Sequence, residues 1–193
     1  MNTTQAQLGA VLAAGGPELT VMLERTERRL AEVAEAAGPE LAAHSTGTLS
    51  AGGKRLRPML VFLCADGDSD ERLVAAAAAV EMLHMATLVH DDVLDSAALR
   101  RGRPTVFAQG GLLAATATGD LLFSRAFAEL AAAGSEDAVR ALSTASSALA
   151  RGELMQRADA WSADVTPERY LERCRLKTAS LFDASCRLGA VFG

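Results

Sequence analysis

The residues best suited to chemistry are three aspartates in one short stretch, Asp91, Asp92 and Asp95. On a helix, the period of about 3.6 residues places His84, Leu88, Asp91 and Asp95 on one face and Asp92 about 100° around it. Carboxylates held this close repel one another, so they need a protonated partner, an Arg or Lys, or a hard metal ion. Mg²⁺ takes one or two carboxylates and completes its shell with water and substrate phosphates. The stretch therefore predicts a magnesium and phosphate site, with Asp92 flanking it or orienting a metal-bound water.

The alternative is that these acids form only a solvated helix face, as charged runs usually do. The preceding run, residues 73–83, is apolar apart from Glu81, as in a buried helix. A helix that is buried in its first half has no structural reason to continue into acids. The context therefore favours the functional interpretation.

A Gly-rich turn upstream carries three cations within four residues, Lys54, Arg55 and Arg57. Pro58 follows and suits the first turn of a helix. Backbone donors at a Gly-rich turn, a helix N-terminus and converging cations form an anion cradle. The spacing is not that of a nucleotide P-loop, and a basic turn alone can simply be solvated. A magnesium diphosphate needs both a cradle and an acidic site, so the two motifs support each other.

Further cations follow the acidic stretch. Arg100 and Arg101 are adjacent, and each guanidinium can grip a phosphate through two parallel hydrogen bonds. Lys177 is one of only two lysines among 19 basic side chains, and it lies in a mainly apolar stretch. We therefore expect its ammonium to face a ligand or a partner acid. Glu153, in a polar segment of a predicted helix, is either a structural buried acid or a group that supports the site.

Composition indicates the class of protein. Half of the 193 residues are hydrophobic, only 4% are aromatic, and Ala and Leu dominate, which favours helices. The net charge of −5 and the absence of a basic cluster argue against nucleic acid as a partner. We find no secretion signal and no apolar run of about 18 residues that would span a membrane. We expect a soluble, cytoplasmic protein.

The chain shows no strand periodicity and no internal repeat, so the predicted fold class is all-α. One predicted helix start is a capping box formed by Asp68 and Glu71, which opens the acidic helix. Another is Thr166, which precedes Pro167. The expected helices cover residues 17–37, 40–50, 58–65, 71–95 and 110–133, a further helix interrupted by the polar segment 151–156, and a last region beginning at Thr166.

Taken in order, these motifs resemble the N-terminal two-thirds of trans-isoprenyl diphosphate synthases, the polyprenyl synthetase family. The matching pieces are residues 52–58, 81–84, 90–95, 100–102, 152–156 and 177–178. The resemblance implies an all-helical bundle of the isoprenoid-synthase type around a deep central cavity, usually in a homodimer. Residues 1–193 are expected to form a single domain of this kind, incomplete at the C-terminus and lacking its last helices.

The resemblance also implies the reaction and the role of each residue. An allylic diphosphate ionises, and isopentenyl diphosphate captures the carbocation to give a linear trans-polyprenyl diphosphate. Developing negative charge on the leaving group would be stabilised by cations positioned beforehand. The implied roles are Mg²⁺ binding by Asp91 and Asp95 with Asp92 assisting, allylic diphosphate binding by Arg100, Lys177 and Thr178, and isopentenyl diphosphate binding by Lys54, Arg57, His84 and Arg101. The catalytic set is Asp91, Asp92, Asp95 and Lys177.

Product length in this family depends on the bulk of residues upstream of the first aspartate. Ala86 lies five residues before Asp91, and Met85 precedes Ala86. A small side chain at Ala86 predicts that the bottom of the central cavity is open and that the product has more than fifteen carbons. Met85 or residues of neighbouring helices are the alternatives that would close it.

The family also has a second aspartate-rich motif beyond the Lys-Thr segment, and this sequence does not contain it. The sequence is then either part of a longer chain or a shortened subunit that works with another protein in a heteromer. A non-catalytic partner subunit is thus one alternative to a prenyltransferase, although such subunits often lose the aspartates kept here. A terpene cyclase is another, but it would not need the second diphosphate cradle formed by Lys54, Arg57 and Arg101.

Overall fold

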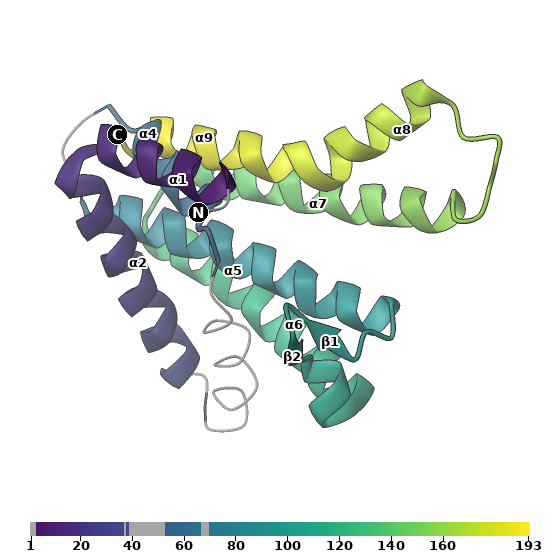
Figure 1. The fold of residues 1–193 in the computed structure, drawn as a ribbon. Helices are drawn as coiled ribbons and strands as arrows, with labels where there is room; N and C mark the ends of the chain where they lie inside the picture. Colours follow the sequence, from purple (N-terminus) through teal and green to yellow (C-terminus); the bar gives the residue numbers. More distant parts are fainter. Residues whose placement is uncertain (1–2, 37, 39–52, 67–69) are drawn as a thin grey trace.

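The computed structural model describes residues 3–36, 38, 53–66 and 70–193 (Figure 1). These residues form helices apart from one small hairpin, so the predicted all-α class is confirmed. The helix expected at residues 40–50 lies outside the described residues. The elements are α1 (Thr3–Ala14), α2 (Gly16–Ala36), α4 (Leu56–Leu63), α5 (Glu71–Leu94), β1 (Leu99–Arg100), β2 (Arg103–Pro104), α6 (Val106–Ala132), α7 (Glu136–Ala158), α8 (Pro167–Cys174), the π-helical turn η1 (Arg175–Ala179) and α9 (Ser180–Phe192).

Helix α5 is the centre of the bundle, with contacts to α2, α4, α6, α7 and α9 (Figure 1). Four consecutive alanines, residues 76–79, are completely buried. Their small side chains let neighbouring helices approach α5 on every side. The larger Leu73 and Leu83 are also buried, and each contributes about 1.5–3 kcal/mol through loss of apolar surface from water. The acidic C-terminal end of α5 is thereby held on a rigid element.

Side-chain caps fix where the helices begin. Asp70 caps α5 by accepting hydrogen bonds from the N–H groups of Arg72 and Leu73, at 2.8 and 3.0 Å. The predicted cap at Asp68 was therefore wrong by two residues, and Asp68 itself lies outside the described residues. The predicted cap at Thr166 is confirmed, because its hydroxyl accepts from the N–H of Arg169.

Helix α6 begins four residues before the predicted start at Gly110. Thr105 provides the cap, since its hydroxyl accepts a hydrogen bond from the N–H of Ala108. Gly111 then departs from helical geometry with a φ of 72°. The glycines that suggested a helix start therefore mark a kink inside α6.

A two-residue turn joins the short antiparallel strands β1 and β2, which the sequence did not predict. Arg100 pairs with Arg103 across the hairpin. The turn residues Arg101 and Gly102 have φ values of 52° and 77°. Positive φ at both central residues is the conformation that matches the twist of a tight hairpin. The turn thus holds the Arg101 backbone in a conformation that few residues other than glycine adopt.

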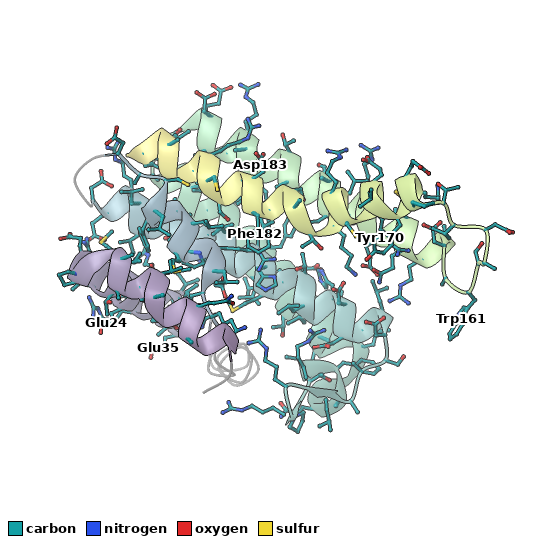
Figure 2. The ribbon with its side chains drawn as sticks, turned by 45° about the horizontal axis from the view of Figure 1, so that its top comes forward. Glu24, Glu35, Trp161, Tyr170, Phe182 and Asp183 are labelled. Atoms are coloured by element: carbon teal, nitrogen blue, oxygen red, sulfur yellow. The ribbon has the colours of Figure 1, made fainter. Side chains whose placement is uncertain are left out.

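Helix α7 is continuous through residues 151–156, so the predicted interruption there was wrong. It runs alongside a second long segment made of α8, η1 and α9 (Figure 1). The connecting loop carries the fully exposed Trp161 at its tip (Figure 2). The π-helical turn η1 contains Lys177, and wide turns of this kind often occur at functional sites.

Among the described residues, two helices are long and apolar enough to cross a membrane by length and composition, contrary to the expectation from the sequence. They are α5 and α6, and a third would be added if the bent pair α1 and α2 formed one span. The most apolar window of α5 is 72% buried within the bundle, whereas that of α6 is only 28% buried. The apolarity of α5 is accounted for by its central position, and α6 leaves an uncovered face.

Candidate functional site

Two adjoining cavities lie at the C-terminal half of α5, and Arg57 and His84 line both of them. The larger has a volume of about 660 Å³ and contains Asp91, Lys177 and Thr178 together with apolar side chains. The smaller, of about 570 Å³, is basic. Its lining consists of Gly53, Lys54, Arg55, Leu56, Arg57, Glu81, His84 and Arg101. We call these the acidic and the basic cavity.

The basic cavity brings together the four residues predicted to hold isopentenyl diphosphate. Lys54 lies before α4, Arg57 in its first turn, His84 on α5, and Arg101 at the tip of the hairpin. The four come from segments up to 47 residues apart in the chain, and the packing of α4 and the hairpin near α5 makes them neighbours. Three cations around one hollow are suited to a doubly charged phosphate group.

Arg57 is the cation of the basic cavity whose surroundings are best suited to binding an anion. It is half-buried, and burial lowers the pKa of its guanidinium, although the charge of Glu81 partly opposes this. Its Nε atom is buried and has no hydrogen-bond partner. A buried unpaired donor on a cation costs free energy, so the arrangement is suited to a ligand that accepts from it.

Arg55 has a structural role. Its guanidinium forms ion pairs with Glu27 on α2 and with Glu81 on α5, the latter at 2.6 Å. The residue adopts a left-handed conformation with a φ of 45° and caps the start of α4. The two glutamates thereby fix the turn that carries Lys54 and Arg57.

His84 is held neutral. Burial lowers the pKa of its imidazole to about 3, and the nearby charges of Arg57 and Arg101 act in the same direction. Folding therefore favours an uncharged ring among cations. An anion bound between them would reverse this electrostatic effect.

Each aspartate of the acidic stretch has its own basic partner. Lys177 Nζ lies 3.7 Å from Asp91 Oδ2 and also contacts Glu153. Burial raises the pKa of the Asp91 carboxyl, while Lys177 lowers it and the charges of Glu153 and Asp95 raise it further. Glu153 is thus a half-buried acid that orients Lys177, one of the two roles left open from sequence.

Asp92 faces away from the acidic cavity. It is only 5% exposed, and one of its oxygens accepts hydrogen bonds from Nε and a terminal nitrogen of Arg100, both at 2.8 Å. The pair attaches the hairpin to α5. The structure therefore joins two predicted site residues to each other, and neither of them is in the lining of the acidic or the basic cavity.

Asp95 is the residue that ends α5, and its carboxylate reaches α7. Arg157 donates to Asp95 Oδ1 at 2.7 Å and to Glu153 Oε1 at 3.2 Å. This contact joins residues 62 positions apart in the chain. Sequence reasoning missed Arg157 because no local motif marks it. Of the face predicted for α5, His84, Leu88 and Asp91 line the acidic cavity, whereas Asp95 lies outside it.

Gly152 places Lys177 by allowing a close approach of α7 and η1. A Cβ atom at this position would lie 2.6 Å from the Lys177 nitrogen and 2.8 Å from its Cα. Any side chain here would displace the backbone that carries the ammonium. The glycine therefore sets the distance between Glu153 and Lys177.

The residues predicted to set product length do not line either cavity. Met85 is 2% exposed and Ala86 is fully buried, on the sides of α5 that pack into the core. The α5 residues that line the acidic cavity upstream of Asp91 are His84, Thr87, Leu88 and His90. Facing them from other helices are Phe123, Leu149 and Leu181.

The donors available to a metal ion are carboxylate oxygens, which match magnesium. Among the residues that the structure describes, no three His, Cys, Asp or Glu side chains converge as a preformed metal cluster. Asp91 and Asp95 offer one carboxylate each on the same end of α5. This set fits an ion that takes one or two carboxylates and fills its remaining positions with water and phosphate oxygens.

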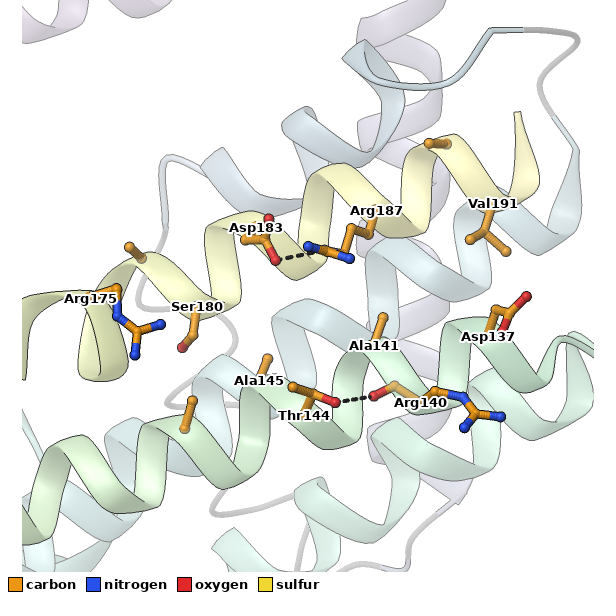
Figure 3. A pocket seen from close by; sticks show the side chains of 13 residues that line it. Asp137, Arg140, Ala141, Thr144, Ala145, Arg175, Ser180, Asp183, Arg187 and Val191 are labelled. Atoms are coloured by element: carbon orange, nitrogen blue, oxygen red, sulfur yellow. Dashed lines mark hydrogen bonds and ion pairs between the residues drawn. The ribbon is translucent and has the colours of Figure 1, made fainter. Parts of the chain in front are cut away.

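A larger hollow lies elsewhere, between α7 and α9 (Figure 3). It measures about 850 Å³ and has small side chains such as Ala141 and Ala145 along its floor. Several of its charged residues pair with near neighbours in the chain, as in the Arg187–Asp183 pair at 2.7 Å. Its lining shows no convergence of charges comparable to that in the two cavities beside α5.

The chain belongs to the polyprenyl synthetase family, whose model matches residues 39–193. It is 47% identical over 145 residues to heptaprenyl diphosphate synthase component 2 of Geobacillus stearothermophilus, covering 74% of this chain and 45% of that protein. It is 37% identical over 145 residues to octaprenyl diphosphate synthase of Escherichia coli, with the same coverage.

Solved structures agree with this assignment. Heptaprenyl diphosphate synthase from Staphylococcus aureus superposes with a TM-score of 0.86 at 33% identity, covering 90% of this chain and 56% of that one. A polyprenyl synthase from Caulobacter crescentus, complexed with calcium and isoprenyl diphosphate, gives 0.86 at 34% identity, with 90% and 53% coverage. The chain thus spans about half the length of the relatives it matches.

Proposed function

We propose that this chain is a Mg²⁺-dependent trans-prenyltransferase, which condenses isopentenyl diphosphate with an allylic diphosphate. The observation that carries the proposal is the pair of cavities that share Arg57 and His84. Two diphosphates bound in adjoining hollows would bring their carbon chains together. The family assignment and the names of the relatives support the same reaction.

Isopentenyl diphosphate would bind in the basic cavity. Lys54, Arg57 and Arg101 would neutralise its diphosphate, with His84 beside them. Since the cations are positioned before substrate arrives, binding does not have to gather them.

The allylic diphosphate would bind in the acidic cavity, with Lys177 and Thr178 at its diphosphate. Asp91 and Asp95 would hold Mg²⁺, with Asp92 assisting through Arg100, which it orients. The ion would supply Lewis-acid stabilisation of the departing diphosphate. The structure of the Caulobacter relative with calcium and isoprenyl diphosphate supports a divalent cation beside such a ligand.

The apolar wall of the acidic cavity would protect the carbocation from water. Leu88, Phe123 and Leu181 contribute to this wall. No side-chain nucleophile is needed, because the second substrate supplies the electron pair. A cavity of about 660 Å³ with Ala150 in its lining is compatible with a product longer than fifteen carbons, and several relatives are named for seven or eight prenyl units.

We also propose that two chains associate through α6. Leu112 and Leu113 on this helix are 61% and 83% exposed, and the neighbouring exposed positions Thr116 and Ala117 are small. An apolar, small-residue face of this length is suited to packing against a copy of itself. A different protein is the alternative occupant, which the word "component" in the name of one relative supports.

A non-catalytic subunit is the second candidate function, because one relative is named as a component of its synthase. The retained Asp91, Asp92 and Asp95 favour catalysis. The basic cavity favours a synthase over a terpene cyclase, since a cyclase has no second diphosphate to bind.

The test is turnover by the purified chain with Mg²⁺, labelled isopentenyl diphosphate and a series of allylic diphosphates. We expect elongated product for the natural chain and none for Asp91→Ala. Product length, read by chromatography, would identify the primer and the final size. Retained diphosphate binding without product would assign the chain to the non-catalytic class, and equal product from Asp91→Ala would refute the assigned role of Asp91.

A further inference from the structure

Five charged side chains form an alternating chain that leads from outside the acidic cavity into its lining. In order they are Asp95, Arg157, Glu153, Lys177 and Asp91, each in contact with the next. The acids outnumber the bases by one. The carboxylates that would face a metal ion are therefore already partly neutralised by the protein itself.

Arg157 is the member of this chain that the proposed reaction does not use. It precedes the last residue of α7, so its backbone is fixed by the helix. Its side chain is 40% exposed and contacts Asp95 at 2.7 Å and Glu153 at 3.2 Å. Both contacts are charged, which indicates an electrostatic role.

We propose that Arg157 is a built-in counter-ion that positions Asp95 in the metal-free protein and competes with the divalent cation for its carboxylate. This inference rests on the proposed magnesium site. Arg157 is a positioning residue, because it acts on the cation through Asp95 and contacts no reacting atom.

Two physical effects follow from the geometry. A cation that binds the Asp95 carboxylate would either take Oδ1 from the guanidinium or bind Oδ2 beside its positive charge, and both effects weaken cation binding. The contact between Arg157 and Glu153 can persist during this exchange, which would keep the guanidinium close enough to return. Exposed ion pairs are individually weak, so the competition would weaken cation binding without preventing it.

The experiment measures Mn²⁺ binding by electron paramagnetic resonance in the full chain, without diphosphate. We expect Arg157→Leu to tighten Mn²⁺ binding by about three- to tenfold. Arg157→Lys keeps the charge and should stay within about twofold of the natural chain. The matched control is Arg140→Leu, on the same helix, where Arg140 pairs with the exposed Glu136 one turn away. It should leave the affinity unchanged.

A double-mutant cycle that combines Arg157→Leu with Asp95→Asn separates direct competition from a general effect of net charge. In that background, Arg157→Leu should no longer tighten binding. Unchanged affinity in Arg157→Leu, or an equal gain in Arg140→Leu, would overturn the inference.

The same measurements separate this inference from the proposed metal site. If binding is lost in Asp91→Asn while Arg157→Leu has no effect, the metal site stands and only the role of Arg157 fails. If the natural chain binds no Mn²⁺, or binds it regardless of Asp91 and Asp95, both fail. Circular dichroism on each variant would establish that it is folded.

Discussion

The guanidinium of Arg57 lies over the ring of Phe182, with 4.6 Å between Cζ and the ring centroid. The contact fixes a half-buried cation at the junction of the two cavities while its Nε remains without a partner. A ring can hold a cation in place without neutralising it. The charge thus stays available to an anion.

Replacing Arg57 with Met should separate stability from binding. Because burial of an incompletely paired cation is costly, we expect the free energy of unfolding to stay within about 1 kcal/mol of the natural value or to rise. The affinity for inorganic diphosphate should fall by about tenfold or more. Urea unfolding and calorimetric titration provide the two measurements. A strongly destabilised variant that still binds diphosphate would show that Arg57 is a structural residue.

Arg101 offers a substitution that keeps the backbone conformation. Asn tolerates positive φ better than most residues, so Arg101→Asn should preserve the hairpin while removing the cation. Loss of a charge-assisted contact to phosphate is worth about 1.5–3 kcal/mol, or roughly ten- to a hundredfold in diphosphate affinity. Calorimetry would measure it. Natural affinity in this variant would exclude Arg101 from the site.

Gly152→Ala should displace Lys177. The added Cβ would lie 2.6 Å from backbone that cannot move independently, and we expect a loss of about 1–3 kcal/mol in the free energy of unfolding. The control is Gly9→Ala in α1, where nothing lies within 4 Å of the new Cβ and a gain of about 0.5–1 kcal/mol is expected. Thermal unfolding of both variants and of the natural chain would measure these stability changes. A Gly152→Ala variant that melts at the same temperature as the natural chain would show that α7 and η1 tolerate separation.

His84 makes stability depend on pH. Its pKa is about 3 in the folded chain and about 6.5 in the unfolded one, so the unfolded state binds more protons between these values. Stability should be complete above pH 6.5 and fall as the pH drops. The loss at pH 5 from this group is about 2 kcal/mol. His84→Gln should lose less stability than the natural chain between pH 7 and pH 5, and an identical loss would contradict the account.

Leu113→Glu should prevent association through α6. A charge in the centre of an apolar interface is costly when it is buried, so the variant should be monomeric under conditions in which the natural chain is a dimer. Analytical ultracentrifugation would report this. The control is Leu171→Glu, because Leu171 is also exposed, at 64%, but lies on α8. Dimers that persist in Leu113→Glu would place the interface elsewhere.

Much of the architecture was predictable because it depends on local rules. The helical period correctly grouped His84, Leu88 and Asp91 at one cavity, and the cap at Thr166 follows from a short sequence signal. The cap at Asp68 was misplaced because Asp70 competes for the same N–H groups. Two nearby acids cannot be ranked without the backbone geometry.

The parts that sequence missed are set by long-range contacts. The pairing of Arg157 with Asp95 joins the ends of α5 and α7, and no spacing rule connects residues 62 positions apart. The hairpin at Arg101 was missed because its strands are only two residues long and show no alternation. Met85 and Ala86 were assigned to the cavity by resemblance, whereas the rotation of α5 turns both toward the core.

The central claim is that two diphosphate sites of different character adjoin at Arg57. Calorimetric titration with inorganic diphosphate, without and then with Mg²⁺, tests it most directly. We predict one metal-independent site that Arg57→Met removes, and a second site that appears only with Mg²⁺ and is lost in Asp91→Asn. A single site, or two sites that respond equally to both substitutions and to the metal, would contradict the account.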